Sequence, residues 1–345
     1  MLRAPALAAS ILASALVAAS PQDATLLLPV HVDRVLVDAR ILDSRGRALR
    51  GLRPEDLRVR IDGKPARVES LDWIAETAVR GESRPSPSSE LPTAGRYPTA
   101  EDPGRQIVFL FQKDFFEPGR LKGLIHMKEY AADFARRLSP RDRAAVLVFD
   151  SHLRLHLDFT SDPERLAEAL RFALLRREPR EILAGEEPSL GRHLDRSAAR
   201  NAATAEKGLE VLGQALEKVP GPKSLVFFCW GLGSLQGGNF QMDPDYGPAR
   251  RALERSRTAV FALDVSYADF HSLEVGLQQV AADTGGFYAR THHSPVVAMD
   301  RLAGALAGHY VLALERPAGS RGSHEIAVDL RARKGTVLAR STYVD

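Results

Sequence analysis

Three aspartates that follow apolar runs are the first candidates for chemistry: Asp114, Asp150 and Asp264. Short continuous apolar runs predict buried strands. In open α/β sheets, ligands bind beyond the carboxyl ends of the strands. Carboxylate oxygens are the ligands that hard cations such as Mg²⁺ prefer. One hypothesis is therefore a divalent-cation site that combines Asp114 with Asp264.

The segment Gly231 to Gly237 offers a second kind of chemistry, because it matches Gly-x-Gly-x-x-x-Gly directly after an apolar run. In dinucleotide-binding units, such glycines let the backbone approach a pyrophosphate at the N-terminus of the next helix. Pro244 and Gly247 interrupt the chain here, so no helix is expected at once. A dinucleotide-binding oxidoreductase stays an alternative, and a flexible loop is the simpler interpretation.

The sequence contains no recognisable catalytic motif. Its single cysteine, Cys229, lies inside an apolar run, which indicates a buried, inert thiol and excludes an intramolecular disulfide. The pair His292-His293 is interpreted as surface loop, with the two side chains pointing apart. Gly-x-Ser-x-Gly, His-Glu-x-x-His and Cys-x-x-Cys are all missing from the chain. We therefore expect a protein that is not an enzyme and needs no cofactor.

A sheet must position these candidate residues. The five consecutive apolar residues Ile107 to Phe111 predict a strand buried on both faces, typical of the middle of a mostly parallel sheet. Over residues 105–308, apolar runs alternate with helical patterns, which predicts an α/β fold with a doubly wound, mostly parallel sheet flanked by helices. Further strands are expected at 144–149, 153–159, 224–229 and 259–263, and helices at 163–173, 196–218 and 248–256, among others.

The two ends of the chain show the alternation of antiparallel strands instead. Residues 29–75 include a hairpin signal at Asp62-Gly63, and residues 309–345 contain three expected strands. Neither segment has much apolar core of its own. We therefore predict that both segments form one small all-β sandwich, with the α/β domain inserted between them. Residues 76–104, rich in Ser and Pro, are interpreted as a linker.

The strand at Ile107 to Phe111 and the segment Ala281 to Tyr288 resemble a von Willebrand factor A (VWA) domain. The resemblance is to the VWA-related domain of exported acidobacterial proteins, in which an "ETGG" segment is similar to 281–288. It implies a VWA/Rossmann-like fold and a rim that other VWA domains use to recognise proteins.

The resemblance also implies that the metal-ion-dependent adhesion site (MIDAS) of this family is degenerate. The family's first strand usually ends in Asp-x-Ser-x-Ser, whereas the corresponding residues here are Gln112, Asp114 and Phe116. A second family carboxylate, in an Asp-Gly pair, corresponds to Trp230 followed by Gly231. The implied function is protein binding or assembly without a metal. The binding-rim residues are taken to be Gln112, Lys113, Asp114, Phe116, Ser151, Trp230, Gly231 and Asp264.

Residues 1–19 resemble a secretory signal peptide, with Arg3 followed by small apolar residues. The protein is therefore expected to be secreted or periplasmic, with no stable membrane span after cleavage. A net charge of +3 gives no reason to expect a nucleic acid as partner, and we expect a protein partner instead.

Overall fold

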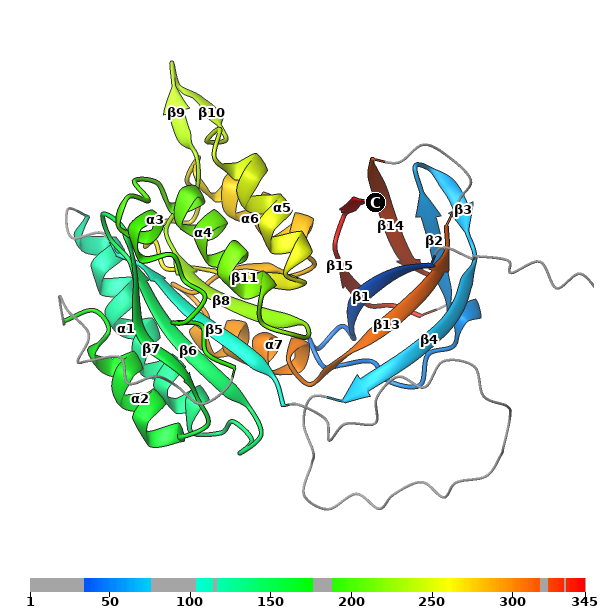
Figure 1. Cartoon of the computed structure of the whole chain (residues 1–345), viewed down its shortest axis with the longest axis horizontal. Coiled ribbons are helices and arrows are strands. Elements are labelled where there is room, and N and C mark those ends of the chain that lie inside the picture. Colours follow the sequence, from blue (N-terminus) through cyan, green and yellow to red (C-terminus); the bar gives the residue numbers. More distant parts are fainter. Residues whose placement is uncertain are drawn as a thin grey trace, which may run out of the picture. The chain divides into compact units, whose positions relative to one another are not determined.

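The computed structural model of the chain describes residues 34–75, 104–113, 117–175, 188–316, 322–331 and 333–344 (Figure 1). The predicted signal peptide, the predicted linker up to residue 103, and the candidate residues Asp114 and Phe116 lie outside these ranges. Within them, no helix has the length and apolar character that crossing a membrane requires.

A six-stranded sheet with the order β12-β11-β8-β5-β6-β7 forms the centre of the α/β part (Figure 1). All neighbouring strands are parallel except β6 and β7, which are antiparallel. The predicted mostly parallel sheet is therefore confirmed. Its strands are β5 (Gln106–Gln112), β6 (Arg143–Phe149), β7 (Leu153–Thr160), β8 (Lys223–Cys229), β11 (Thr258–Asp264) and β12 (Tyr288–Arg290).

Helices cover both faces of this sheet, and strand β5 explains why. Its side chains alternate between two apolar clusters: Phe109 and Phe111 belong to one, and Val108 and Leu110 to the other. Helices α1 (Pro118–Ala135), α2 (Pro163–Phe172) and α7 (Pro295–Ala305) pack into the first cluster. Helices α3 (Arg196–Arg200), α4 (Ala205–Glu217), α5 (Tyr246–Arg255) and α6 (Glu274–Thr284) pack into the second. The predicted burial of Ile107 to Phe111 is confirmed, and Gln106 and Gln112 at the two ends of the strand are buried as well.

The helix predicted at 196–218 is in fact two helices, α3 and α4. Thr204, predicted to lie inside a helix, is the N-cap of α4, and its hydroxyl accepts a hydrogen bond from the Lys207 N–H. Cap residues compete with helix continuation because their side chains bond the backbone locally. The same hydroxyl donates to Asp245, 3.3 Å away, which ties the start of α4 to the start of α5.

The two terminal segments form two antiparallel four-stranded sheets, in the orders β15-β1-β13-β4 and β16-β14-β2-β3. Apolar residues of both sheets belong to one buried cluster, for example Val37 of β1 and Val59 of β2. None of β13 to β16 joins the central sheet. The strands are β1 (Arg34–Leu42), β2 (Leu57–Ile61), β3 (Lys64–Ala66), β4 (Val68–Ala75), β13 (Gly308–Glu315), β14 (Ser323–Leu330), β15 (Thr336–Ala339) and β16 (Thr342–Val344).

The hairpin predicted at Asp62-Gly63 is confirmed, since Val59 pairs with Ala66 and both turn residues have positive φ. In place of the three strands expected in residues 309–345, the described residues form four, β13 to β16, and the difference arises at Val337 to Tyr343. The chain there divides into β15 and β16, which pair in different sheets.

The α/β part is inserted between two strands that pair with each other. Strand β4 ends at Ala75, and β13 begins at Gly308, and these two residues are partners in an antiparallel register. The chain therefore leaves the antiparallel sheet and re-enters it at neighbouring positions. Nearby, the buried Arg105 guanidinium, just before β5, pairs with Asp142 and donates to the carbonyl of Leu306, 3.0 Å away.

Lys223, at the start of β8, gives a testable dependence of stability on pH. Burial, aided by the charge of Arg257, lowers the pKa of its ammonium to about 8. An unfolded lysine has a pKa of about 10.4. Between these values the unfolded chain binds more protons than the folded one, so the contribution of Lys223 raises the free energy of unfolding with pH, by up to about 3 kcal/mol.

Urea denaturation at pH 7.5 and pH 10 measures this rise. Lys223→Gln should remove it, because the amide keeps a donor for the Val219 carbonyl but does not titrate. The exposed Lys218→Gln is the matched control and should keep the wild-type dependence. An unchanged dependence in Lys223→Gln would contradict the prediction.

Candidate functional site

The carboxyl ends of the parallel strands β5, β6, β8 and β11 meet at one edge of the central sheet. The described candidate residues all come from these strand ends or directly follow them. We call the set the rim: Gln112, Lys113, Ser151, Trp230, Gly231 and Asp264.

Gln112, the last residue of β5, joins the ends of β5 and β8 through its side chain. Its amide nitrogen donates to the Gly231 carbonyl, 2.9 Å away, and its amide oxygen accepts from the Trp230 N–H at 3.0 Å. The side chain is buried. A carboxylate accepts only, so an Asp or Glu at this position would leave the Gly231 carbonyl without this donor.

Lys113 brings a fixed positive charge to the rim. Its side chain is buried, and its ammonium lies 4.0 Å from a carboxylate oxygen of Asp150, which also pairs with Arg154. Burial alone raises the pKa of Asp150, but the hydrogen bond from the Ser151 N–H and the charges of Arg154 and Lys113 outweigh it and lower that pKa. Ser151 itself is exposed beside this pair.

Asp264 lies buried at the end of β11 inside a network of hydrogen bonds. It accepts from the Tyr288 hydroxyl at 2.8 Å, and it contacts the ring nitrogen of His271 at 2.9 Å. The same hydroxyl lies 3.2 Å from Glu274, which accepts two hydrogen bonds from Arg290 at 2.8 Å. Burial raises the pKa of Asp264. The hydrogen bonds that Asp264 accepts, led by that of His271, outweigh burial and lower this pKa overall.

The ligand atoms of Asp264, His271 and Glu274 lie within 4.8 Å of one another, so the group has the composition of a metal site. In this structure Arg290 already provides a cation to Glu274. Sequence reasoning missed His271 and Glu274. They lie seven and ten residues after Asp264, and no regular spacing predicts that the chain between them folds back.

Trp230 is half-buried beneath a cation. The guanidinium carbon of Arg120 lies 3.9 Å from the centre of its ring, a close cation–π contact. Its indole N–H is buried and has no partner among the described residues. Gly231 cannot carry a side chain here, because a Cβ would lie 2.7 Å from that of Leu273.

Two exposed aromatic residues follow β11, and each is paired with a cation. Phe270 is 79% exposed, with the Arg290 guanidinium 4.5 Å from its ring centre. Tyr267 is 38% exposed, with Lys122 4.9 Å from its ring centre. Together with the Arg120–Trp230 pair, they make three aromatic–cation pairs in or close to the rim in sequence, and no pattern of strand-end carboxylates predicts them.

The prediction that His292 and His293 point apart is wrong. Their ring centres lie 3.7 Å apart, and His293 contacts the Asp269 carboxylate at 2.7 Å. His292 also lies 4.8 Å from the Tyr267 ring, so the pair adjoins the aromatic residues just described. Asp269 and the two histidines form a second group with metal-ligand atoms within 4.8 Å of one another.

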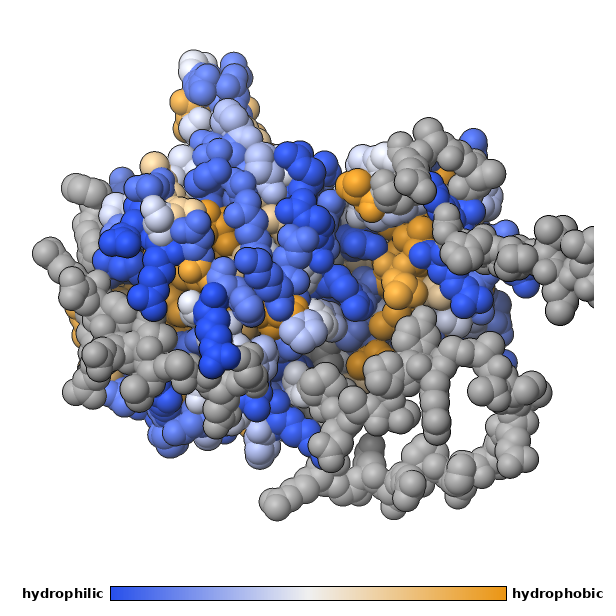
Figure 2. Space-filling model, viewed as in Figure 1, coloured by the Kyte–Doolittle hydropathy of each residue, from blue (hydrophilic) through white to orange (hydrophobic). Residues whose placement is uncertain are grey.

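The glycine-rich segment after β8 is a hairpin, which corrects its interpretation as a loop. Strands β9 (Ser234–Gln236) and β10 (Asn239–Gln241) pair across Gly237-Gly238, both at positive φ, and project from the α/β part (Figure 1). The hairpin surface is mostly hydrophilic (Figure 2). The next helix in the chain, α5, begins only at Tyr246, after the hairpin, so the segment lacks the direct passage from glycine loop to helix that a dinucleotide-binding unit has. The geometry does not fit a dinucleotide.

A scan of protein-family models finds no match to this chain. A search of curated proteins finds no match either. Among solved structures, the chain is similar to proximal thread matrix protein 1 from the mussel byssus, with 13% identity and a TM-score of 0.39, over 61% of this chain and 48% of that one. A structure of the mussel protein with a zinc-occupied MIDAS motif gives 14% identity and a TM-score of 0.39, over 62% and 48%.

The chain is also similar to the conserved hypothetical protein BatB from Bacteroides thetaiotaomicron, with 12% identity and a TM-score of 0.34. That similarity covers 59% of this chain and 98% of BatB. The chain thus spans about half the length of the mussel protein.

Proposed function

We propose that this chain is an exported, non-enzymatic protein-binding or assembly module. Its α/β part is a VWA-like domain of the acidobacterial VWA-related type, whose adhesion site has lost its metal. The terminal segments form a β-sandwich that carries this domain as an insertion. The observation that supports the loss of the metal most directly is the Gln112 side chain, which links β5 to β8 by two hydrogen bonds.

The described rim residues do not fit a Mg²⁺ ion. Mg²⁺ needs oxygen ligands in octahedral geometry, usually with a carboxylate. Gln112 uses its amide oxygen and its amide nitrogen for the backbone of 230–231, and Trp230 brings no oxygen ligand. Lys113 adds a positive charge that repels a cation. Hydrogen bonds thus hold together the two strand ends that a metal would otherwise bridge.

The composition of the rim supports a protein partner. Aromatic residues and arginine concentrate binding energy in protein interfaces, and lysine is less favoured there. Trp230 with Arg120 and Phe270 with Arg290 supply both residue types. Phe270 is 79% exposed and Trp230 is half-buried, and the accessible surface of both would become buried on contact with a partner. We infer that these two pairs are the main contacts.

Calorimetric titration of the chain with Mg²⁺, Mn²⁺ and Ca²⁺ tests the loss of the metal. We expect no binding heat with any of the three ions. Saturable binding that Asp114→Ala abolishes would contradict the proposal and would favour a rearranged site using Asp114 with Asp264.

A cation-dependent adhesion domain is the second candidate, favoured by the group Asp264, His271 and Glu274. Its mixed oxygen and nitrogen ligands suit Zn²⁺ or Mn²⁺ better than Mg²⁺. Binding there would have to displace Arg290 from Glu274. A titration with Zn²⁺ that shows one site in the wild type and none in His271→Gln would support this second candidate by showing that a cation binds at this group.

A pull-down from the envelope of the native cell tests protein binding. We expect Trp230→Ala and Phe270→Ala each to reduce recovery of the bound partner by roughly tenfold, since truncation of an anchoring aromatic residue typically costs 1–3 kcal/mol or more. Ile74→Ala is the matched control, because Ile74 is an exposed apolar residue of β4, outside the central sheet. Equal recovery by all four proteins would contradict the rim as the binding surface.

A further inference from the structure

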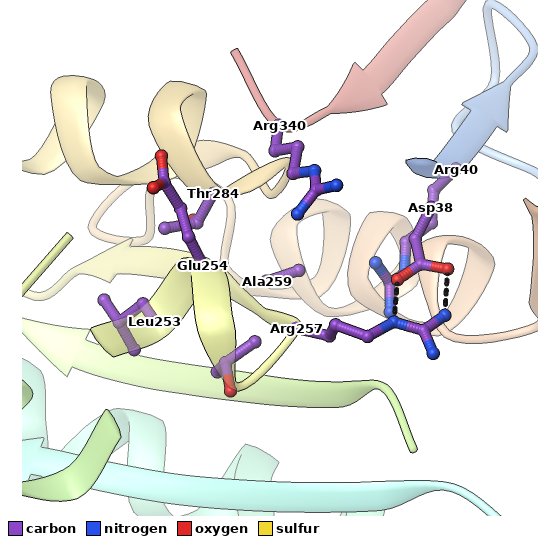
Figure 3. Close-up of a pocket in the computed structure, with 9 residues that line it drawn as sticks. Asp38, Arg40, Leu253, Glu254, Arg257, Ala259, Thr284 and Arg340 are labelled. Carbon is purple, nitrogen blue, oxygen red and sulfur yellow. Dashed lines mark hydrogen bonds and ion pairs between the residues drawn. The ribbon is translucent and has the colours of Figure 1, made fainter. Parts of the chain in front are cut away.

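A small cavity lies away from the rim, among charged residues of five segments. Its volume is about 20 Å³. Strand β1, the end of α5, the start of β11, the end of α6 and the residue after β15 line it (Figure 3). The charged residues among the lining are Asp38, Arg40, Glu254, Arg257 and Arg340.

Both carboxylates of the cavity are already engaged. Arg257 binds Asp38 through two hydrogen bonds, of 2.8 and 2.5 Å, drawn as dashed lines in Figure 3. Glu254 accepts a hydrogen bond from the Thr342 hydroxyl. Three guanidinium groups face two carboxylates, which leaves one positive charge in excess. Arg40 and Arg340 have no carboxylate partner within the described part of the chain.

Arg40 is the unusual residue of this cavity. Only 3% of it is exposed, and its contacts are one hydrogen bond to the Ser224 hydroxyl, 3.2 Å away, and the ring of Phe261, 5.4 Å from its guanidinium carbon. Its Nε–H is buried and has no partner among the described residues. A buried charged donor left without a partner costs more than a neutral one.

Arg340, the residue after β15, lines the same cavity and resembles Arg40 in its contacts. It donates to the Leu36 carbonyl at 2.7 Å, and its Nε–H is buried without a partner among the described residues. Arg40 is buried and Arg340 is half-buried, and each lines the cavity with a buried N–H that needs an acceptor. The excess positive charge favours an anion over a water molecule as that acceptor.

We propose that this cavity binds a small inorganic anion of chloride size, held by Arg40 and Arg340. A cavity needs about 10–15 Å³ to hold one water molecule, so 20 Å³ admits a ligand about the size of one atom and excludes a nucleotide or a sugar phosphate. The anion neutralises the excess charge. It also links β1 to the end of β15, and it therefore stabilises the folded chain.

Thermal unfolding tests the proposal when it is measured at several chloride concentrations. Gluconate, which is too large for the cavity, replaces chloride to keep the ionic strength constant. The melting temperature of the wild type should rise with chloride to a plateau, by about 2 °C or more. Arg340→Gln should lose this rise. Arg255→Gln, which removes the same charge from an exposed ion pair of α5, should keep it. Equal chloride dependence of all three proteins would overturn the site.

Crystals of the wild type grown in bromide give a second test that needs no variant. An anomalous peak within about 3.5 Å of Nε of Arg40 is the expected result. A water molecule there, with no anomalous signal, would overturn the proposal even if chloride raised the melting temperature.

Discussion

Gln112→Glu should lower the free energy of unfolding at pH 7 by about 2–4 kcal/mol, although it replaces only an NH₂ group by an oxygen. The Glu carboxylate cannot donate to the Gly231 carbonyl, so two acceptors would face each other where a 2.9 Å hydrogen bond now exists. The new charge would also be buried. Urea denaturation of both proteins measures the difference.

The effect of Gln112→Glu should shrink in acid. Burial raises the pKa of the new carboxyl above its unfolded value of about 4.3, and the protonated form regains a donor. The destabilisation is therefore smallest below the unfolded pKa and grows as the pH rises through the folded pKa. Gln236→Glu, on the exposed hairpin, is the control and should change stability little. A Gln112→Glu protein as stable as the wild type at pH 7 would refute the importance of the Gln112 hydrogen bonds.

Arg105→Met should be the most damaging of the substitutions considered, with a loss of about 3–5 kcal/mol. It would leave the Asp142 carboxylate fully buried without its cation, and it would remove the donor to the Leu306 carbonyl. Asp142 also accepts hydrogen bonds from the backbone N–H groups of Arg105 and Ser139, so the carboxylate cannot turn toward water without breaking them. Denaturation in guanidinium chloride measures the loss.

The double variant Arg105→Met/Asp142→Asn separates charge from packing. Asn carries no charge and keeps one acceptor oxygen, which serves one of the two backbone N–H groups that now bond to separate carboxylate oxygens. We expect the double variant to be more stable than Arg105→Met alone by at least about 1 kcal/mol. If the free-energy losses of Arg105→Met and Asp142→Asn simply add in the double variant, the unpaired buried charge is not the cause of the loss.

Local patterns predicted the central strand and several helix ends because burial and turn chemistry leave direct signals in sequence. Ile107 to Phe111 is buried on both faces. Gly285, of the residue type most common just after a helix, ends α6 in the left-handed region at φ 77°. The predictions failed where one or two residues fit a second local structure that the pattern also allows. Thr204 caps a helix instead of continuing one, and Gly237-Gly238 is a hairpin turn inside what read as a loop.

The candidate site was less predictable because its contacts join distant parts of the chain. Strand ends correctly indicated where Trp230 and Asp264 lie, since parallel strands bring their carboxyl ends to one edge. The role of Gln112 depends on Gly231, 119 residues later, and no local pattern reveals that hydrogen bond. The stacking of Arg120 on Trp230 likewise requires the tertiary fold.

The pairing of Ala75 with Gly308 has a consequence for synthesis of the chain on the ribosome. Strand β1 cannot meet β13 until the whole inserted α/β part has been translated, which takes roughly 10–50 s at typical rates of about 5–20 residues per second. The inserted part has its own buried clusters and can fold while β1, β2 and β4 still lack their C-terminal partners. During that interval their unpaired edges are open to aggregation, so the nascent chain should depend on a holding chaperone until its last strands emerge.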